Sequence, residues 1–149
     1  MVSLAIPICE HNIKPPERNS QDVRCLALAC CKTAQVMHSC SLVHRDFRLD
    51  NVVRLSDDSW MVIDLELSSK SPTKLPSDYT QKGWDHATTE PSGPDYKLYT
   101  PLSDMHQIGI MLSPLLKPSY SQASRNFVIG LLGKTLSADQ ALLHEWLKS

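Results

Sequence analysis

One polar stretch of eight residues constrains the fold of this chain more than any other feature. It reads His44-Arg45-Asp46-Phe47-Arg48-Leu49-Asp50-Asn51, and the short run Val62-Ile63-Asp64 follows it. Carboxylate and amide groups of this kind accept protons and bind hard cations such as Mg²⁺. They do so only when they converge. Asp46, Asn51 and Asp64 are therefore the residues whose positions matter most for any site in this chain.

An amphipathic helix is predicted over residues 21–40, directly before this stretch. Its apolar residues recur at steps of three and four and form one stripe: Val23, Leu26, Ala27, Cys30, Ala34 and Met37. Ser20 is the predicted N-cap, and Asp22 places an acidic group in the first turn. The stripe indicates a helix that is buried in the core.

Two β-type runs are predicted after the polar stretch, over residues 51–55 and 60–63. The residues between them, Ser56-Asp57-Asp58-Ser59, are turn formers. A hairpin of these runs puts Asn51 at the start of one strand and Asp64 at the end of the other. Both side chains then lie at the same edge, where they can share a cation.

The rest of the chain divides into a long loop and further helices. Residues 68–100 are rich in Ser, Thr, Pro, Lys and Asp, and are predicted to be a functional loop without regular structure. Helical periodicity resumes over residues 103–116, where Asp104 lies at the start and Gly109 permits close packing. A helix is predicted over residues 122–135. The S-x-x-Q pattern Ser137-Ala138-Asp139-Gln140 then predicts a capping box before a short last helix.

Composition limits the classes of protein that fit. The chain has 149 residues, of which 42% are hydrophobic, and this suits one globular domain. Its formal net charge of −1 argues against nucleic acid or an anionic membrane as the main partner. The apolar runs are too short to span a bilayer, and no signal peptide is recognised. A cytoplasmic or nuclear location is expected.

The pattern H-R-D-x-x-x-x-N, followed by Asp64, resembles the catalytic loop and metal-binding motif of protein kinases. Asp104 with Gly109, and a closing helix that contains Trp146, occur in the same order as in that family. The resemblance implies a kinase-like C-terminal lobe, mostly α with a small β-hairpin (α+β). Its extent would be residues 21–149, with the catalytic loop at 44–51 and an activation segment at about 64–90.

The resemblance also implies residue roles. Asp46 would be the catalytic base, with the cation of Arg48 offsetting phosphate charge and favouring Ser/Thr acceptors. Asn51 and Asp64 would hold Mg²⁺ and so bind the cofactor ATP. Arg45 would pair with a phosphate on the activation segment. The candidate phosphate acceptors in that segment are Ser69, Ser71, Thr73 and Tyr79.

His44 and Asp104 would support the loop, His44 by packing under it and Asp104 by holding its backbone. A plain N-cap is the alternative role of Asp104, and the two are compatible.

Several departures from the family pattern bear on activity. Asp64-Leu65-Glu66 replaces the D-F-G motif, and Leu65 is expected to pack as the Phe does, while Glu66 removes a flexible hinge. Glu90 matches the Glu of the A-P-E motif, but its usual Arg partner is missing, so that ion pair is expected to be lost. No Gly-rich loop precedes His44. The N-terminal ATP lobe is therefore expected to be absent, with residues 1–20 as a hinge-like irregular segment.

Three functions follow as hypotheses. The first is Ser/Thr-type phosphotransfer from ATP to a protein hydroxyl, weak or absent in the chain alone because the upper lobe is missing. The second is a pseudokinase or interaction module that binds a protein substrate or a partner kinase. The third, suggested by Asp64-x-Glu66, is a small-molecule phosphotransferase of the aminoglycoside or choline kinase type. Self-association through the face that an upper lobe normally covers is also expected.

Overall fold

The computed structural model describes residues 19–55 and 59–149 as a small α+β domain. The helices are α1 (Ser20–Ser39), α2 (Pro101–Leu112), α3 (Gln122–Leu132), α4 (Ala138–Leu142) and α5 (Glu145–Lys148), with 3-10 turns η1 (Leu49–Asn51) and η2 (Ser113–Leu115). The strands are β1 (Leu42–Val43), β2 (Val52–Arg54), β3 (Trp60–Val62), β4 (Ser69–Lys70), β5 (Thr73–Pro76), β6 (Glu90–Pro91) and β7 (Tyr96–Tyr99). The hinge predicted over residues 1–20 lies outside the described residues, apart from residues 19 and 20. Residues 56–58 of the predicted turn also lie outside them.

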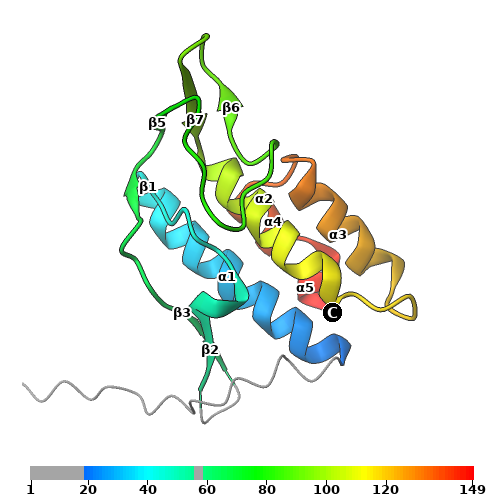
Figure 1. Ribbon diagram of the computed structural model, residues 1–149. Coiled ribbons are helices and arrows are strands. Elements are labelled where there is room, and N and C mark those ends of the chain that lie inside the picture. The colour runs from blue at the N-terminus through cyan, green and yellow to red at the C-terminus, as the bar shows by residue number, and fades with distance from the viewer. Residues whose placement is uncertain (1–18, 56–58) are drawn as a thin grey trace, which may run out of the picture.

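Helix α1 is the central element of the core, as its apolar stripe predicts. It packs against α2, α4, α5 and β3 (Figure 1). The N-cap prediction was wrong by one residue: Asn19 is the cap, and its side chain accepts a hydrogen bond of 2.8 Å from Asp22 N. An Asn side chain performs this function as well as Ser does, so pattern alone could not place the helix start.

Helices α2 and α3 pack closely because Gly109 has no side chain. A Cβ atom at this position would lie 3.1 Å from Leu131 and Leu132 of α3, tighter than ordinary contact. Helix α2 begins at Pro101 rather than at 103, and Thr100 is its N-cap. Asp104 therefore lies in the first turn and is not the N-cap. The capping box at Ser137 and Gln140 is confirmed.

The predicted hairpin is present as the antiparallel pair β2–β3. Its register pairs Val52 with Val62 and Arg54 with Trp60. A second antiparallel pair, β1–β4, joins the segment before His44 to the segment after Asp64. The polar stretch thus connects two strand pairs.

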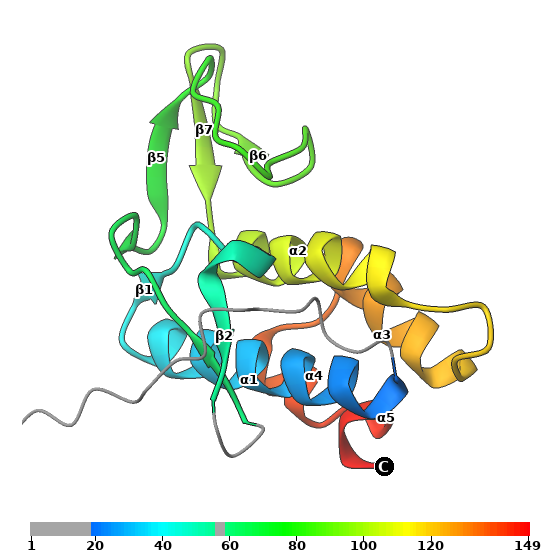
Figure 2. The same cartoon turned by 60° about the horizontal axis from the view of Figure 1, so that its bottom comes forward.

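The long loop predicted over residues 68–100 is partly a sheet instead. Strands β5, β7 and β6 form it in that spatial order, all antiparallel. It extends away from the helices in both views (Figure 1, Figure 2). The run Tyr96–Tyr99 has the aromatic and apolar residues that favour strands, but its partner β5 lies some twenty residues earlier. Leu75 and Tyr99 form a small second apolar cluster with Val43.

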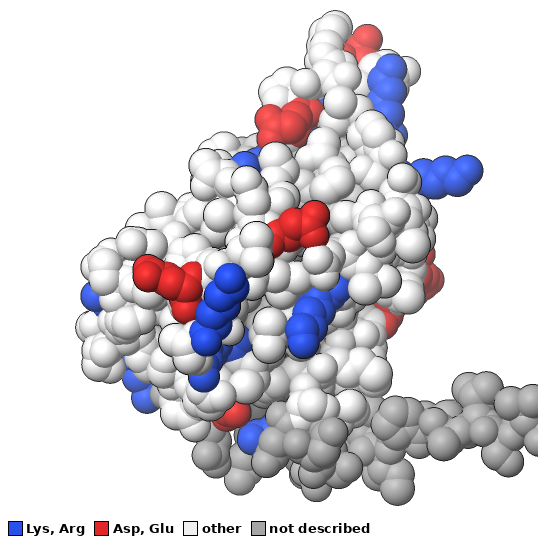
Figure 3. Space-filling view, turned by 180° about the vertical axis from the view of Figure 1, so that it is seen from behind, with Lys and Arg blue, Asp and Glu red and all other residues white. Residues whose placement is uncertain are grey.

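The surface carries charges of both signs. Figure 3 shows one face on which Lys and Arg side chains alternate with Asp and Glu side chains. This matches the net charge of −1. Among the described residues, none of the helices has the length and apolar character needed to cross a bilayer.

Candidate functional site

Asp46 is the most enclosed carboxylate of the polar stretch, with 5% of its surface exposed. The Asn51 side chain donates from Nδ2 to Asp46 Oδ2 at 2.6 Å and to the Asp46 carbonyl at 3.0 Å. Arg48 Nε lies 3.3 Å from Asp46 Oδ1 as an ion pair, and Arg48 Nη1 lies 3.7 Å from Asp50. The structure therefore brings Asp46, Arg48 and Asn51 together, while their catalytic roles stay a prediction.

Asp104 is fully buried beneath the polar stretch and accepts four hydrogen bonds. The backbone N–H groups of His44 and Arg45 donate to its two oxygens, both at 2.9 Å. The side chains of His38 and Tyr99 contact the same oxygens at 2.9 and 2.6 Å. A carboxylate with this many donors fixes the backbone around it, because each donor loses its partner if the loop moves.

Tyr99, Gln107 and His38 support this loop and were missed by the sequence analysis. Gln107 Oε1 accepts from Phe47 N at 3.1 Å and contacts the Tyr99 hydroxyl at 2.9 Å. Burial, followed by the charge of Asp104, raises the pKa of Tyr99 well above its usual value, so the phenol remains a donor. Gln107 lies three residues after Asp104, on the same helix face, and that spacing was a usable signal.

His44 is buried and packs under the loop. Its ring stacks on Phe47 with centroids 4.5 Å apart, and its Nδ1 accepts from Asp46 N at 3.2 Å. An accepting Nδ1 requires the neutral ring. Desolvation lowers the pKa of His44, although Asp104, the Ile63 backbone, Asp46 and Asp64 oppose part of that shift.

Replacing His44 with Phe is expected to flatten the acid dependence of stability. Below the ordinary histidine pKa of about 6.5 the unfolded chain binds a proton that the folded ring resists, so the wild type loses unfolding free energy as the pH falls. Urea unfolding between pH 7 and pH 5 measures this slope. His86→Phe, at an exposed position, is the matched control. Equal slopes in the wild type and in His44→Phe would refute the assignment.

Arg45 adopts φ +72 and turns its guanidinium toward two aromatic rings. The guanidinium carbon lies 5.6 Å from the Tyr79 ring centre and 5.9 Å from that of Trp84. Arg45 Nη2 also donates to the Tyr79 hydroxyl at 3.2 Å. Of the candidate phosphate acceptors, Tyr79 is therefore the one in contact with Arg45, and the contact is made by the unmodified side chain.

Asn51 and Asp64 lie at the same edge of the hairpin, as the register requires. Ile63 N donates to the Asn51 carbonyl at 2.9 Å, one residue before Asp64. Asp64 is exposed with φ +62, and its Oδ1 accepts from Glu66 N at 3.3 Å. The packing predicted for Leu65 was wrong: this side chain is 56% exposed. The acidic residues on either side of Leu65, Asp64 and Glu66, are also exposed, and their charges favour a turn at the surface.

Asn51 and Asp64 have the types of oxygen atom that bind magnesium. Mg²⁺ prefers oxygen ligands and takes most of its octahedral shell from water and phosphates, with only one or two ligands from carboxylates. An amide oxygen of Asn51 and a carboxylate of Asp64 meet that demand. Within residues 19–55 and 59–149, no group of three or more His, Cys, Asp or Glu side chains forms an alternative metal site.

Glu90 has a cationic partner, contrary to expectation. Lys134, two residues after the end of α3, places its Nζ against Glu90 Oε1. The ion pair was expected to be lost because the loop after α3 has no arginine, but a lysine supplies the positive charge instead. The sequence also did not predict a second contact, in which His106 of α2 connects Asp85 to α3. Its ring lies 2.9 Å from the Asp85 carboxylate and 2.8 Å from the Leu132 carbonyl. Burial raises the pKa of Asp85, but the hydrogen bond and charge of His106 outweigh it and lower the pKa overall.

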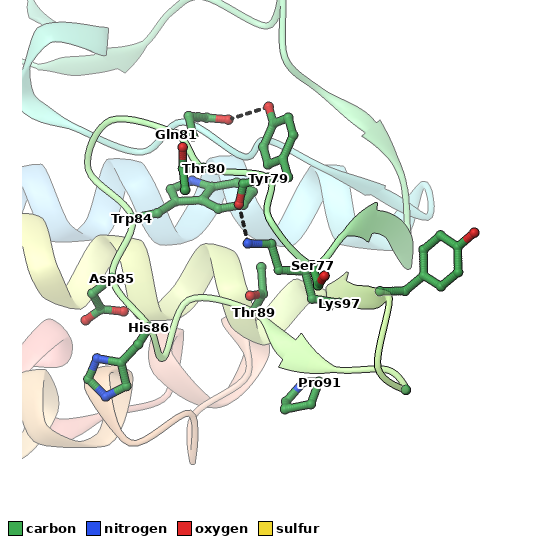
Figure 4. A pocket seen from close by; sticks show the side chains of 12 residues that line it. Ser77, Tyr79, Thr80, Gln81, Trp84, Asp85, His86, Thr89, Pro91 and Lys97 are labelled. Carbon is green, nitrogen blue, oxygen red and sulfur yellow. Dashed lines mark hydrogen bonds between the residues drawn. The ribbon is translucent and has the colours of Figure 1, made fainter.

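A pocket of about 520 Å³ opens between residues 77–89 and strands β6 and β7. Figure 4 shows Tyr79, Gln81 and Trp84 along one side, with Lys97 crossing toward Tyr79. Gln81 connects this pocket to the polar stretch, because its Nε2 donates to the Arg45 carbonyl at 2.7 Å and lies 3.3 Å from Asp46 Oδ1.

Comparison with known proteins gives one partial match. Over 85 residues the chain is 34% identical to mitogen-activated protein kinase 17 of Arabidopsis thaliana. The match covers 54% of this chain but only 17% of that relative. No family model matches the chain. The match indicates a distant relationship to protein kinases.

Proposed function

We propose that the chain is a kinase-like lower lobe whose site serves phosphoryl transfer from ATP to a Ser or Thr hydroxyl of a protein. The observation that carries the proposal is the enclosed Asp46 carboxylate, held by Asn51 at 2.6 Å with Arg48 at 3.3 Å. Phosphoryl transfer needs a positioned carboxylate and charge stabilisation and little covalent chemistry. The partial similarity to a plant kinase supports the same class.

Each residue has a defined task in this proposal. Asp46 accepts the proton of the substrate hydroxyl, and Asn51 fixes the orientation of its carboxylate. Arg48 offsets negative charge next to it. Asn51 and Asp64 supply the oxygen ligands for Mg²⁺, and bound Mg²⁺-ATP supplies the phosphoryl group. Asp104 holds the loop backbone on which Asp46 and Arg48 are carried.

The metal site is tested by titration of the isotope-labelled chain with Mn²⁺ and ADP, followed by NMR. Paramagnetic broadening is expected first at the amides of residues 51 and 64, and Asp64→Asn should remove it. Asp139→Asn, at an exposed site on α4, should leave it unchanged. Broadening that spreads over other carboxylates and persists in Asp64→Asn would contradict the proposed ligands.

The transfer step is tested by incubating the chain with Mg²⁺-ATP and protein substrates. We expect little incorporation of phosphate, because the 149 residues contain no Gly-rich loop to orient the nucleotide. Any incorporation should fall by about 10²-fold or more in Asp46→Asn, since a positioned base contributes about 10²–10⁴ to such rates. Incorporation that Asp46→Asn leaves intact, or that occurs only with small alcohols, would contradict protein-hydroxyl transfer.

A second candidate function is an interaction module. Leu65 and Leu67, which follow Asp64 closely in the chain, are both large apolar side chains on the surface. Such a surface suits a protein partner that covers it. Absence of Mn²⁺-ADP binding, together with a stable protein complex that Leu65→Ser disrupts, would favour this function over phosphoryl transfer.

A further inference from the structure

His106, in the middle of α2, has a buried imidazole ring with a hydrogen-bond acceptor on each side. Only 3% of its surface is exposed. Its Nδ1 lies 2.8 Å from the carbonyl oxygen of Leu132, and its Nε2 lies 2.9 and 3.1 Å from the two oxygens of Asp85. A neutral imidazole carries one proton and donates on one side only, so its other nitrogen would face an oxygen lone pair. Both contacts are hydrogen bonds only when the ring carries two protons.

Neither acceptor can supply the second proton. The Leu132 oxygen belongs to a backbone carbonyl, which only accepts. Asp85 Oδ1 already accepts hydrogen bonds from the backbone N–H of Ala87 at 2.9 Å and from the Thr88 hydroxyl at 3.1 Å. These donors, and a side chain that is 43% exposed to water, favour the ionised carboxylate. The proton between Asp85 and His106 therefore belongs to the ring.

The end of α3 also favours a positive charge at this position. Leu132 is the last residue of α3, and the final carbonyls of a helix lack partners within it and carry partial negative charge. The backbone N–H groups of residues 133–135 donate to the carbonyls of residues 129–131. The carbonyl of Leu132 contacts His106 instead. The ring thus connects the Asp85 carboxylate to the C-terminus of α3.

The charged groups on the neighbouring segments are engaged elsewhere or exposed. Lys134, two residues after the end of α3, pairs with Glu90. Asp104, on the same helix as the ring, is occupied by its four hydrogen-bond donors. His86, which follows Asp85 in the chain, is exposed. Asp85 is therefore the charged side chain in contact with the ring.

We infer that His106 is an imidazolium anchor, which holds residues 85–89 to α2 and α3 and releases them when the pH rises and the ring loses a proton. Asp85, His86 and Thr89 line the 520 Å³ pocket, and Figure 4 shows Asp85 and His86 together at one end of it. While the ring is charged, both bonds are made. When one proton leaves, one nitrogen becomes an acceptor opposite an oxygen, and the bond on that side is lost. The inference does not depend on phosphoryl transfer.

The charge of the ring is tested by long-range ¹H–¹⁵N NMR of the full chain, with the His106 signals assigned by their loss in His106→Phe. At about pH 7.5, one unit above the ordinary histidine value of about 6.5, a reference peptide is mostly neutral. Both ring nitrogens of His106 should still show the chemical shift of protonated nitrogen. Asp85→Asn should remove this signature, because its amide has no charge that stabilises the second proton. An unprotonated His106 nitrogen in the wild type at this pH would overturn the inference.

The anchor is tested by deuterium exchange of residues 85–89, corrected for the pH dependence of intrinsic exchange. In the wild type, protection at about pH 9 should be about 10-fold lower than at about pH 6.5, the effect of losing one charge-assisted hydrogen bond. His106→Phe keeps an aromatic ring without the charge, so protection should be low at both pH values. Asp85→Asn, at the exposed side of the pair, should also lose the pH dependence, and it keeps the test valid if His106→Phe does not fold.

Two controls separate release of residues 85–89 from other changes. His86→Phe replaces the neighbouring histidine at an exposed position and should keep the pH dependence of the wild type. Unchanged exchange in α1 identifies the variants whose core is intact. An equal pH dependence in the wild type and in Asp85→Asn, with α1 still protected, would overturn the inference. It would leave the proposal of phosphoryl transfer untouched.

Discussion

Asp104→Asn is expected to destabilise the fold by about 2–4 kcal/mol, although it removes no heavy atom from the buried site. Asp104 accepts all four of its hydrogen bonds, and an asparagine amide replaces one accepting oxygen with an NH₂ donor. On the Oδ2 side that donor would face the His44 N–H and the His38 ring. Buried groups left without partners cost about 1–3 kcal/mol each. The charge assistance of the other bonds is lost as well.

Urea unfolding at neutral pH measures the effect of Asp104→Asn. Asp139→Asn is the matched control, because Asp139 is exposed on α4 and its carboxylate accepts a hydrogen bond from the Gln35 side chain at the surface. That variant should change the unfolding free energy by less than about 0.5 kcal/mol. A loss below about 1 kcal/mol for Asp104→Asn would show that the loop backbone does not depend on this carboxylate.

Phe127→Ala should cost about 3–5 kcal/mol, the usual loss for a large aromatic side chain in a packed core. Phe127 of α3 is fully buried. Its ring lies 5.1 Å from that of Trp146 and 5.2 Å from that of His144, measured between centroids. It therefore joins α3 to the short helix α5, which has too few residues to be stable without such packing.

The thermal midpoint and the urea midpoint of Phe127→Ala should both fall, and deuterium exchange in α5 should rise. Ile129→Ala is the control on the same helix, since Ile129 is 64% exposed and its truncation leaves no cavity. If both variants lose the same small amount, α5 is held by contacts other than Phe127.

The polar stretch, helix α1 and the β2–β3 hairpin were predictable because their determinants are local. The stripe of α1 repeats within one helix, and the turn formers after Leu55 separate two β-type runs that pair with each other. The common edge of Asn51 and Asp64 then follows from the register alone. The bonds that Asp104 makes with the polar stretch span about sixty residues, and only the family resemblance suggested them.

The errors in the region after Asp64 have a different cause, which is pairing between residues far apart in sequence. Strand β5 pairs with β7 across the segment that contains Gln81 and Trp84, and no local pattern specifies that partner. Lys134 meets Glu90 from 44 residues away. The exposure of Leu65 likewise depends on what packs above the turn, and not on its own hydrophobicity.

The junction between β7 and α2 divides this region into a part that tolerates change and a part that does not. Tyr99 ends the strand, and Asp104 follows within the first turn of the helix. A peptide tag or loop inserted at Gly93, in the connection between β6 and β7, lengthens the three-stranded sheet at its outer turn. The same insertion at Thr100 would separate Tyr99 from Asp104, whose side chains are joined by a hydrogen bond. The turn between β6 and β7 is therefore the place for an insertion or a reporter group.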